Sequence, residues 1–393
     1  MWGVGMKRNR VIFCIMWILS LVGISFFGGA ASYGLFALLT LAPVVSFAYL
    51  LCVMAYFRIY QELDSRNLVA NHTVPFYFTL MNEYFFGFAG IKVRFFSSFS
   101  TISGLDDGVE YELLPKTGIQ KQTSLLCKYR GEYEVGIKYV EMQDFLRLFR
   151  IIHHNRETLR VMVRPDLVEL EELHGIDDME AMARESLTER TEPDVVVRRF
   201  EQGDDLKHVN WKASARSGEL LTRRFVGEER EGVSILLGTW RCSGEQLEYL
   251  PVENKMLETA LAIALFFAKR KIPVTTYFLT DDIRQEALSG LEGFDAYYGL
   301  ISALEFREEQ REGMFLERLS GNRELFSSRT AFLILHELGN EADGMARLLS
   351  ENHVGTYVYW ICDQVPEHLP VGSVPRVQVR RIGTDEDLRN GVL

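Results

Sequence analysis

Cysteine is scarce in this sequence, and the few cysteines form no recognisable pattern. The 393 residues include five cysteines, an odd number, and no two of them have the spacing Cys-x-x-Cys. This argues against a disulfide framework or a zinc site and is typical of a reducing compartment. Positive charge is also in short supply, since the net charge is -11. A chain that binds nucleic acid usually needs a basic surface, so we expect no nucleic-acid partner.

Charge is almost absent from two runs near the N-terminus, residues 11–27 and 35–57. Each run is close to the ~20 residues that a helix needs to cross the hydrocarbon core of a bilayer. A cleavable signal peptide is the alternative for the first run. Against it, the second run follows at once, and residues 29–31 make a poor cleavage site. We therefore expect residues 1–60 to form a two-helix transmembrane hairpin that makes the lipid bilayer a partner.

Basic residues flank this hairpin on both sides. Lys7, Arg8 and Arg10 precede the first run, and Arg58 and Arg66 follow the second. Loops rich in lysine and arginine stay on the cytoplasmic side of a membrane. The pattern predicts a multi-pass protein of the cell membrane, with its soluble domains on the cytoplasmic face.

No long helical pattern interrupts residues 61–165. Short segments rich in aromatic and β-branched residues alternate there with glycine, asparagine and aspartate, which predicts strands and a small β-sandwich. The clearest segments are residues 76–80, 91–95, 109–113 and 133–137. Five phenylalanines in this region could pack in the core, which we favour, or could form a membrane-facing or partner-facing patch. They are Phe85, Phe86, Phe88, Phe95 and Phe96.

Residues 166–194 are rich in aspartate and glutamate. Such a tract is typical of a solvated linker or a loose helix. Carboxylates also bind divalent cations, but the spacing here matches no calcium-binding loop. We expect a linker and no metal.

From residue 233 onward the pattern alternates between strands and helices. Residues 233–237 form a continuous apolar run, as in a strand that is buried on both faces. Alternation of this kind predicts a doubly wound, mostly parallel α/β sheet. The remaining predicted strands are 274–279, 331–335, 356–361 and the possible edge strand 377–379, and the predicted helices are 253–270, 291–309 and 341–352.

Between the linker and this sheet lies a segment, residues 195–230, with an unusual density of polar residues interleaved with aromatics. Its candidate partner-binding or structural residues are Arg199, Gly203, Asp204, Asp205, Trp211, Lys212, Ser214, Arg216, Gly218 and Arg224. Carboxylate–arginine bonds could hold the segment in one shape, with Trp211 either packed beneath it or available to a partner.

A hydrolase is the alternative interpretation of the same segment. It would use Ser214 and His208, with Asp204 or Asp205. However, proximity in sequence does not make a catalytic triad, and Ser214 does not lie in a Gly-x-Ser-x-Gly elbow. We therefore predict that the protein is not an enzyme and has no cofactor.

The same segment resembles the bacterial domain of unknown function 58 family, through the run Trp211-Lys212-Ala213-Ser214-Ala215-Arg216 and the residues around it. Residues 129–133 and 144–149 are similar to two further family motifs, an Arg-Gly-x-Tyr strand and an Asp-Pro-Phe-Gly-Leu-Phe-like turn. Together with the paired N-terminal helices, the likeness covers nearly the whole chain. It implies a scaffold that works with a MoxR-type AAA+ ATPase and often with a membrane transglutaminase-like protein.

The resemblance also implies a C-terminal domain, within residues 195–393, similar to a von Willebrand factor A domain. Such domains often bind a magnesium-type ion through an Asp-x-Ser-x-Ser loop after the first strand. Residues 238–242 (Gly-Thr-Trp-Arg-Cys) stand at that place, and His336-Glu337 stand where a further aspartate is usual. Carboxylate and hydroxyl oxygens are what a hard cation needs, so we expect no metal site here.

Overall fold

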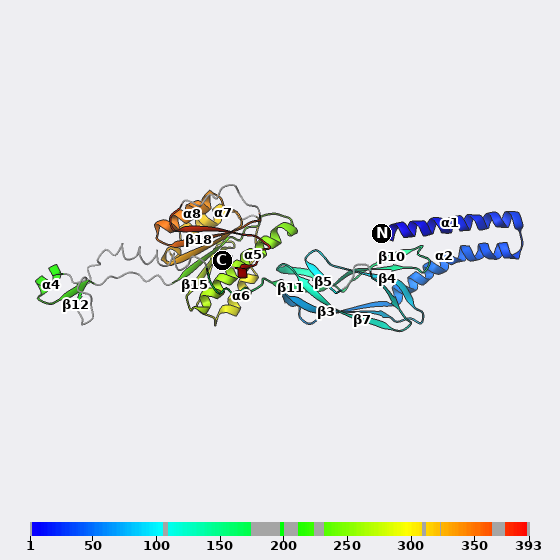
Figure 1. Cartoon of the computed structure of the whole chain (residues 1–393), viewed down its shortest axis with the longest axis horizontal. Helices are drawn as coiled ribbons and strands as arrows, with labels where there is room; N and C mark the ends of the chain where they lie inside the picture. Colours follow the sequence, from blue (N-terminus) through cyan, green and yellow to red (C-terminus); the bar gives the residue numbers. More distant parts are fainter. Residues whose placement is uncertain are drawn as a thin grey trace. The chain divides into compact units, whose positions relative to one another are not determined.

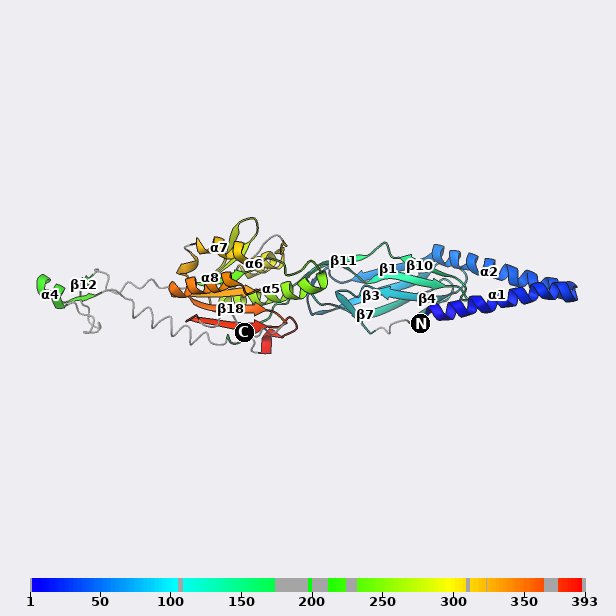
Figure 2. The ribbon, with the colours of Figure 1, turned by 90° about the horizontal axis from the view of Figure 1, so that it is seen from above.

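The computed structural model describes residues 2–104, 109–173, 197–199, 211–223, 232–308, 312–322, 324–363 and 374–390. The chain divides into two compact units, Met1–Asp166 and Leu167–Leu393. Each unit has its own buried core, and each is described by itself (Figures 1 and 2).

The first unit begins with two long apolar helices, α1 (Trp2–Phe27) and α2 (Ala30–Tyr56). Both are long and apolar enough to cross a membrane. Gly28 and Gly29 join them with φ angles of 54° and 104°, values that a side chain would disfavour. The helices lie side by side, and the Trp17 indole donates a hydrogen bond to Thr40 Oγ1 over 3.0 Å. The chain therefore combines a β unit and an α/β unit with two paired apolar helices at its N-terminus.

Eleven strands follow α2 in the described residues of this unit, and β1 begins directly where the helix ends. They form two four-stranded sheets, in the orders β1-β3-β7-β5 and β10-β9-β4-β6, and a three-stranded sheet, β2-β11-β8. The bounds are β1 (Phe57–Leu63), β2 (Asn67–Val69), β3 (Thr73–Asn82), β4 (Phe88–Phe95), β5 (Ser100–Ser103), β6 (Glu110–Leu113), β7 (Gly118–Cys127), β8 (Gly131–Val135), β9 (Ile137–Gln143), β10 (Arg150–His154) and β11 (Leu159–Arg164). The predicted strands 76–80, 91–95 and 109–113 match β3, β4 and β6, whereas 133–137 is split between β8 and β9 at Gly136.

The inward side chains of the two larger sheets form one buried cluster. Phe76 and Phe78 of β3 meet Ile91 of β4 and Val140 of β9 there. Leu50 and Val53 of α2 belong to the same cluster. Because α2 runs into β1 between Tyr56 and Phe57 and shares the core of the strands, the helix is part of this unit and not a separate tether.

The predicted phenylalanine set is divided between core and surface. Phe88 is 1% exposed, and Phe86 and Phe95 pack against the buried cluster. Phe85, in contrast, is 68% exposed. Core packing therefore accounts for several members of the set but not for Phe85.

The second unit contains a six-stranded sheet in the order β16-β15-β14-β17-β18-β19. All neighbouring pairs are parallel except β15 with β16. The strands are β14 (Val233–Leu237), β15 (Val274–Leu279), β16 (Ile283–Leu288), β17 (Thr330–Leu335), β18 (Gly355–Ile361) and β19 (Val377–Ile382). The sequence pattern did not predict β16, because three consecutive residues within this edge strand, 284–286, are all polar.

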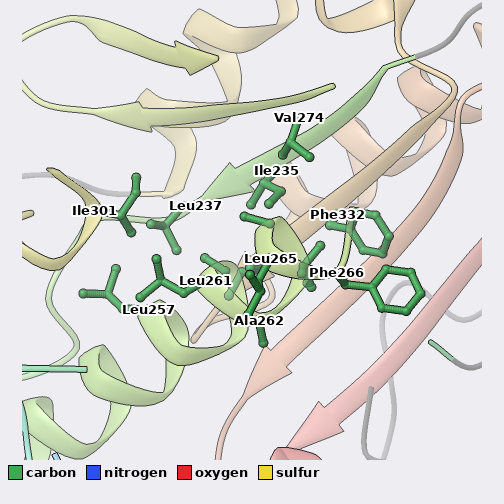
Figure 3. Close-up of a cluster of buried hydrophobic side chains, with 14 of the residues drawn as sticks. Ile235, Leu237, Leu257, Leu261, Ala262, Leu265, Phe266, Val274, Ile301 and Phe332 are labelled. Atoms are coloured by element: carbon green, nitrogen blue, oxygen red, sulfur yellow. The ribbon is translucent and has the colours of Figure 1, made fainter. Parts of the chain in front are cut away.

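Helices cover both faces of this sheet. Alternate side chains of a strand point to opposite faces, so Ile235 packs with α5 (Gln246–Lys269) and α6 (Phe294–Ser302) while Leu236 packs with α7 (Glu312–Ser320) and α8 (Asn340–Glu351). Figure 3 shows the first of these cores, in which Leu257 of α5 lies near Leu237 of β14 and Ile301 of α6, and Leu265 lies on the side of Phe332 of β17. The predicted helix 291–309 was too long, since it ends at Ser302.

The start of the acidic tract differs from the solvated linker that we expected. Val168, Leu170 and Leu173 are buried in the same core as α5, and Lys269 pairs with Glu169. An acidic residue between two buried apolar ones can face solvent, so high charge alone did not indicate exposure. Residues 174–194 lie outside the described residues.

Candidate functional site

In an open α/β sheet, ligands usually bind beyond the carboxyl ends of the strands where the strand order changes direction. Here that point lies between the neighbouring strands β14 and β17. From β14 the chain continues to β15 and β16 on one side of the sheet, and β17, β18 and β19 lie on the other side. Residues 238–242 follow β14, and residues 336–339 follow β17. These two loops are the place to look for a site in the second unit.

The side chain of Trp240 fills the space between the two loops. It is 3% exposed, and its ring centroid lies 5.3 Å from that of His336 and 6.0 Å from that of Phe315. A Cβ added at Gly238 would lie 2.5 Å from Cζ3 and 2.6 Å from Cη2 of the indole. Gly238 is therefore required for the ring to lie where it does.

His336 is the titratable neighbour of this indole. Burial lowers the pKa of His336 to about 4, so the imidazole is neutral at physiological pH. The backbone oxygen of His336 accepts a hydrogen bond from Trp360 Nε1 over 3.0 Å. Trp240 Nε1 and His336 Nδ1 have no hydrogen-bond partner among the described residues. The neutral imidazole and the buried indole thus lie together at the point where the strand order changes direction.

The side chains around this point are engaged in fixed contacts. Thr239 Oγ1 donates a hydrogen bond to the Leu279 oxygen over 2.7 Å. Arg241 pairs with the buried Glu253 over 2.9 Å and lies 3.8 Å above the centre of the Tyr249 ring. No group of three histidine, cysteine, aspartate or glutamate side chains that could hold a metal occurs in the described parts of the chain. The described side chains at this edge are held by packing, by the Thr239 hydrogen bond and by the Arg241–Glu253 ion pair.

A second candidate is the segment 195–230, of which the structure describes two stretches, residues 197–199 and 211–223. β12 (Val197–Arg199) pairs antiparallel with β13 (Leu221–Arg223), and α4 (Trp211–Ser217) precedes β13 (Figure 1). Arg199 therefore lies in β12, opposite Leu221. Gly203, Asp204, Asp205, His208 and Arg224 lie outside the described residues.

Ser214 has a structural contact that explains its burial. Its Oγ accepts a hydrogen bond from the Leu221 N–H over 2.9 Å, and the side chain is 8% exposed. Gly218, with a φ of 71°, ends α4 and donates its N–H to the Ser214 oxygen over 3.0 Å. A left-handed glycine is a common way to end a helix. Ser214 and Gly218 thus fix the turn between α4 and β13.

Trp211, in contrast to Ser214, is exposed to solvent. It is 65% exposed at the start of α4, and Lys212 and Arg216 of the same helix are exposed as well. Exposed tryptophan beside arginine is the composition that protein interfaces favour. The described part of the segment therefore separates into a buried serine that supports the fold and an exposed surface that carries Trp211, Lys212 and Arg216.

A groove of about 390 Å³ lies between α7 and α8. Its wall is apolar at Leu316, Met345 and Leu348, and its polar groups are Ser320 and the carboxylates of Glu317 and Glu341. The chemistry of this groove suits a basic or apolar group better than an anion.

Sequence reasoning missed a polar junction between α2 and the β-sheets. Asp144, 2% exposed, begins the turn between β9 and β10 and accepts a hydrogen bond from Ser46 of α2. The same carboxylate accepts the N–H groups of Phe149, over 2.7 Å, and Leu146, over 3.2 Å. Arg10 of α1 donates to the Leu148 oxygen of this turn over 2.7 Å. The sequence offered one signal for this junction, which is that Ser46 is the single serine in the apolar run 35–57.

Comparisons with known proteins do not assign a family. No family model and no curated protein matches the chain. Similar solved structures include the cupredoxin domain of amoB from Nitrosocaldus yellowstonii, with 7% identity, 30% of this chain and 97% of that chain covered, and a TM-score of 0.21. Another is the sporulation control protein Spo0M from Bacillus subtilis, with 12% identity, 37% and 58% covered, and a TM-score of 0.18.

A third is a GH20 exo-β-N-acetylglucosaminidase from Vibrio harveyi, with 11% identity, 81% and 58% covered, and a TM-score of 0.16. TM-scores of this size do not establish a shared fold for any of the three. The functional argument therefore rests on the described residues.

Proposed function

We propose that this protein is a membrane-tethered scaffold of the domain of unknown function 58 type, which works with a MoxR-type AAA+ ATPase. The α/β unit is then a von Willebrand factor A-like domain that binds partners without an ion. The observation that carries the proposal is the buried Trp240 at the change of strand order, where it lies over Gly238 and beside His336. A site closed by packing favours recognition through the outer surface over catalysis in a crevice.

The turn between β9 and β10 supports the family assignment. The family motif Asp-Pro-Phe-Gly-Leu-Phe has glycine at its fourth position, where this chain has Arg147. Arg147 adopts a φ of 56°, the left-handed conformation that glycine favours. The backbone at Arg147 thus has a conformation that a glycine at this position would favour, and the first residue of the motif is the buried Asp144.

The membrane orientation follows from charge. Lys7, Arg8 and Arg10 lie at the start of α1, and Arg58 lies just after α2. Loops with basic residues tend to stay in the cytoplasm, so the proposal has both ends of the hairpin, the β-sheets and the α/β unit on the cytoplasmic side. A MoxR-type ATPase would meet the protein on this side, and a membrane transglutaminase-like protein is a second partner on the same hypothesis.

The exposed face of α4 is the proposed contact with the ATPase. Its test is co-purification of the ATPase with full-length protein from solubilised membranes, comparing Trp211→Ala and Asp204→Ala with the unchanged chain. Leu247, which is also 65% exposed but lies at the start of α5, provides the matched control Leu247→Ala. We expect recovery to fall about tenfold for Trp211→Ala and to stay unchanged for the control. Equal recovery for all variants would remove α4 from the contact.

A further inference from the structure

The length of α2 shows where the bilayer ends along the first unit. α2 starts at Ala30, next to the Gly28-Gly29 turn, and Tyr49 is its twentieth residue. At 1.5 Å per residue, these twenty residues span about 30 Å, the thickness of a hydrocarbon core. If the turn lies at the far side of the core, as the proposed anchor requires, Tyr49 lies at the near boundary.

Two loops of the β-sheets meet α2 at this same level. Tyr49 Oη donates to the Gly87 oxygen and accepts the Ala89 N–H, each over 3.1 Å. The Tyr49 ring lies 5.3 Å from the ring of Phe86, in the loop before β4, and 5.5 Å from that of Phe145, in the turn after β9. The hydroxyl and the two ring contacts hold both loops against the helix.

A third loop, between β6 and β7, is tied to the first. The Asn82 side chain donates to the oxygens of Phe86, over 2.8 Å, and Leu114, over 3.0 Å. The N–H of Lys116 donates to the Tyr84 oxygen over 3.0 Å. All three loops therefore gather at the end of the sheets where α2 enters, beside β4 and β10 (Figures 1 and 2).

Each of the three loops presents one large apolar side chain outward. Phe85 is 68% exposed, Leu114 is 71% exposed and Phe145 is 57% exposed. Exposed basic residues, Lys116 and Arg147, follow two of them in sequence. Aromatic side chains with nearby cations are the composition of the interfacial layer of a bilayer, where the apolar part contacts acyl chains and the charge contacts headgroups.

We propose that Phe85, Leu114 and Phe145 form a rim that inserts into the interfacial layer of the bilayer, so that the β-sheets rest on the membrane surface. This inference rests on the proposed transmembrane hairpin, because the rim meets lipid only if α1 and α2 span. The buried Asp144–Ser46 bond and the Tyr49 contacts fix the height of the rim relative to the helices. The first unit is thus a lipid-contacting platform and not a domain on a stalk.

The test uses the full chain in lipid nanodiscs that contain a phosphatidylcholine with a photoactivatable diazirine on its acyl chain near the glycerol. Lipid adducts are mapped by peptide mass spectrometry after illumination. We expect adducts in α1, α2 and the three loops, with a yield in the loops at least tenfold above that of the peptide with Met162. Met162 is the internal control, because it is 51% exposed on β11, at the other end of the strands (Figure 1).

The double variant Phe85→Ser/Phe145→Ser should lower the yield in the loops at least fivefold and leave the helices unchanged, and Met162→Ser should change neither. Adducts in the helices with none in the loops would overturn the rim while leaving the anchor intact. Absence of adducts in α1 and α2 would instead refute the proposed membrane insertion. The two failures are therefore distinct.

Discussion

The contact between Gly238 and Trp240 allows a sharp test of the closed site. In Gly238→Ala, the new methyl group would lie 2.5 Å from Cζ3 of the indole and 3.2 Å from Leu335 Cδ2. Both neighbours are rigid or packed, since Trp240 and Leu335 are buried. Overpacking of this kind typically costs about 1–3 kcal/mol of folding free energy.

Trp240→Leu removes the ring and leaves space, so it costs about 2–4 kcal/mol by loss of buried apolar surface and creation of a cavity. In that background the methyl group of Gly238→Ala meets no ring. The double variant should therefore be more stable than the sum of the single changes predicts, by about 1–2 kcal/mol. The coupling reports on the ring, because the contact of the new methyl group with Leu335 is present in both backgrounds and cancels.

Urea unfolding of the detergent-solubilised chain, followed by far-ultraviolet circular dichroism, measures the three changes in free energy. Leu247→Ala, at an exposed position of the same unit, is the control for surface substitution and should change the stability little. Additive effects of Gly238→Ala and Trp240→Leu would show that the indole does not lie over Gly238 in solution. That result would remove the observation on which the proposed function depends.

Three further predictions concern buried polar groups. Asp144→Ala leaves Ser46 and two backbone N–H groups without their acceptor and should cost about 2–4 kcal/mol, whereas Asp144→Asn should cost less; melting in detergent measures both. His336 has a folded pKa of about 4, below its unfolded value, so the unfolded chain takes up the proton first. The free energy of unfolding that depends on neutral His336 is fully present above pH 6.5. It is lost as the pH falls toward 4, by at most about 3 kcal/mol. The midpoint of urea unfolding of His336→Phe should not show this loss. Ser214→Ala should lower the free energy of unfolding by about 1 kcal/mol, because it removes the acceptor for the Leu221 N–H. A fluorophosphonate should not label Ser214 in the folded chain. Stoichiometric labelling would instead favour the hydrolase.

Much of the architecture could be predicted because it depends on periodicity. The continuous apolar run at 233–237 becomes the fully buried β14, and the run of strands and helices after it becomes a sheet with helices on both faces. β16 escaped prediction because an antiparallel edge strand can keep polar side chains on both faces. Its residues pair with β15 through the backbone, which no side-chain pattern records.

The candidate sites were less accessible, because they depend on contacts distant in sequence. Nothing near Trp240 indicates that its ring lies over Gly238 and beside His336, 96 residues farther along the chain. Likewise, Ser46 and Asp144 are 98 residues apart. Ser214 is a third case, because the bond between its hydroxyl and the Leu221 N–H, which supports a backbone turn, has no counterpart in the sequence pattern.

The two units have separate cores, and this determines how each unit unfolds. The buried cluster of the first unit includes Leu50 and Val53 of α2, so shifting the helix would disrupt the core of the β-sheets. The clusters of the second unit are built from Val168 onward, and among the described residues they share no member with the first. Each core therefore sets its own free energy of unfolding, and two transitions are expected rather than one. A partner that binds the α/β unit can therefore stabilise it without changing the free energy of unfolding of the first unit, which is the behaviour that the proposed scaffold requires.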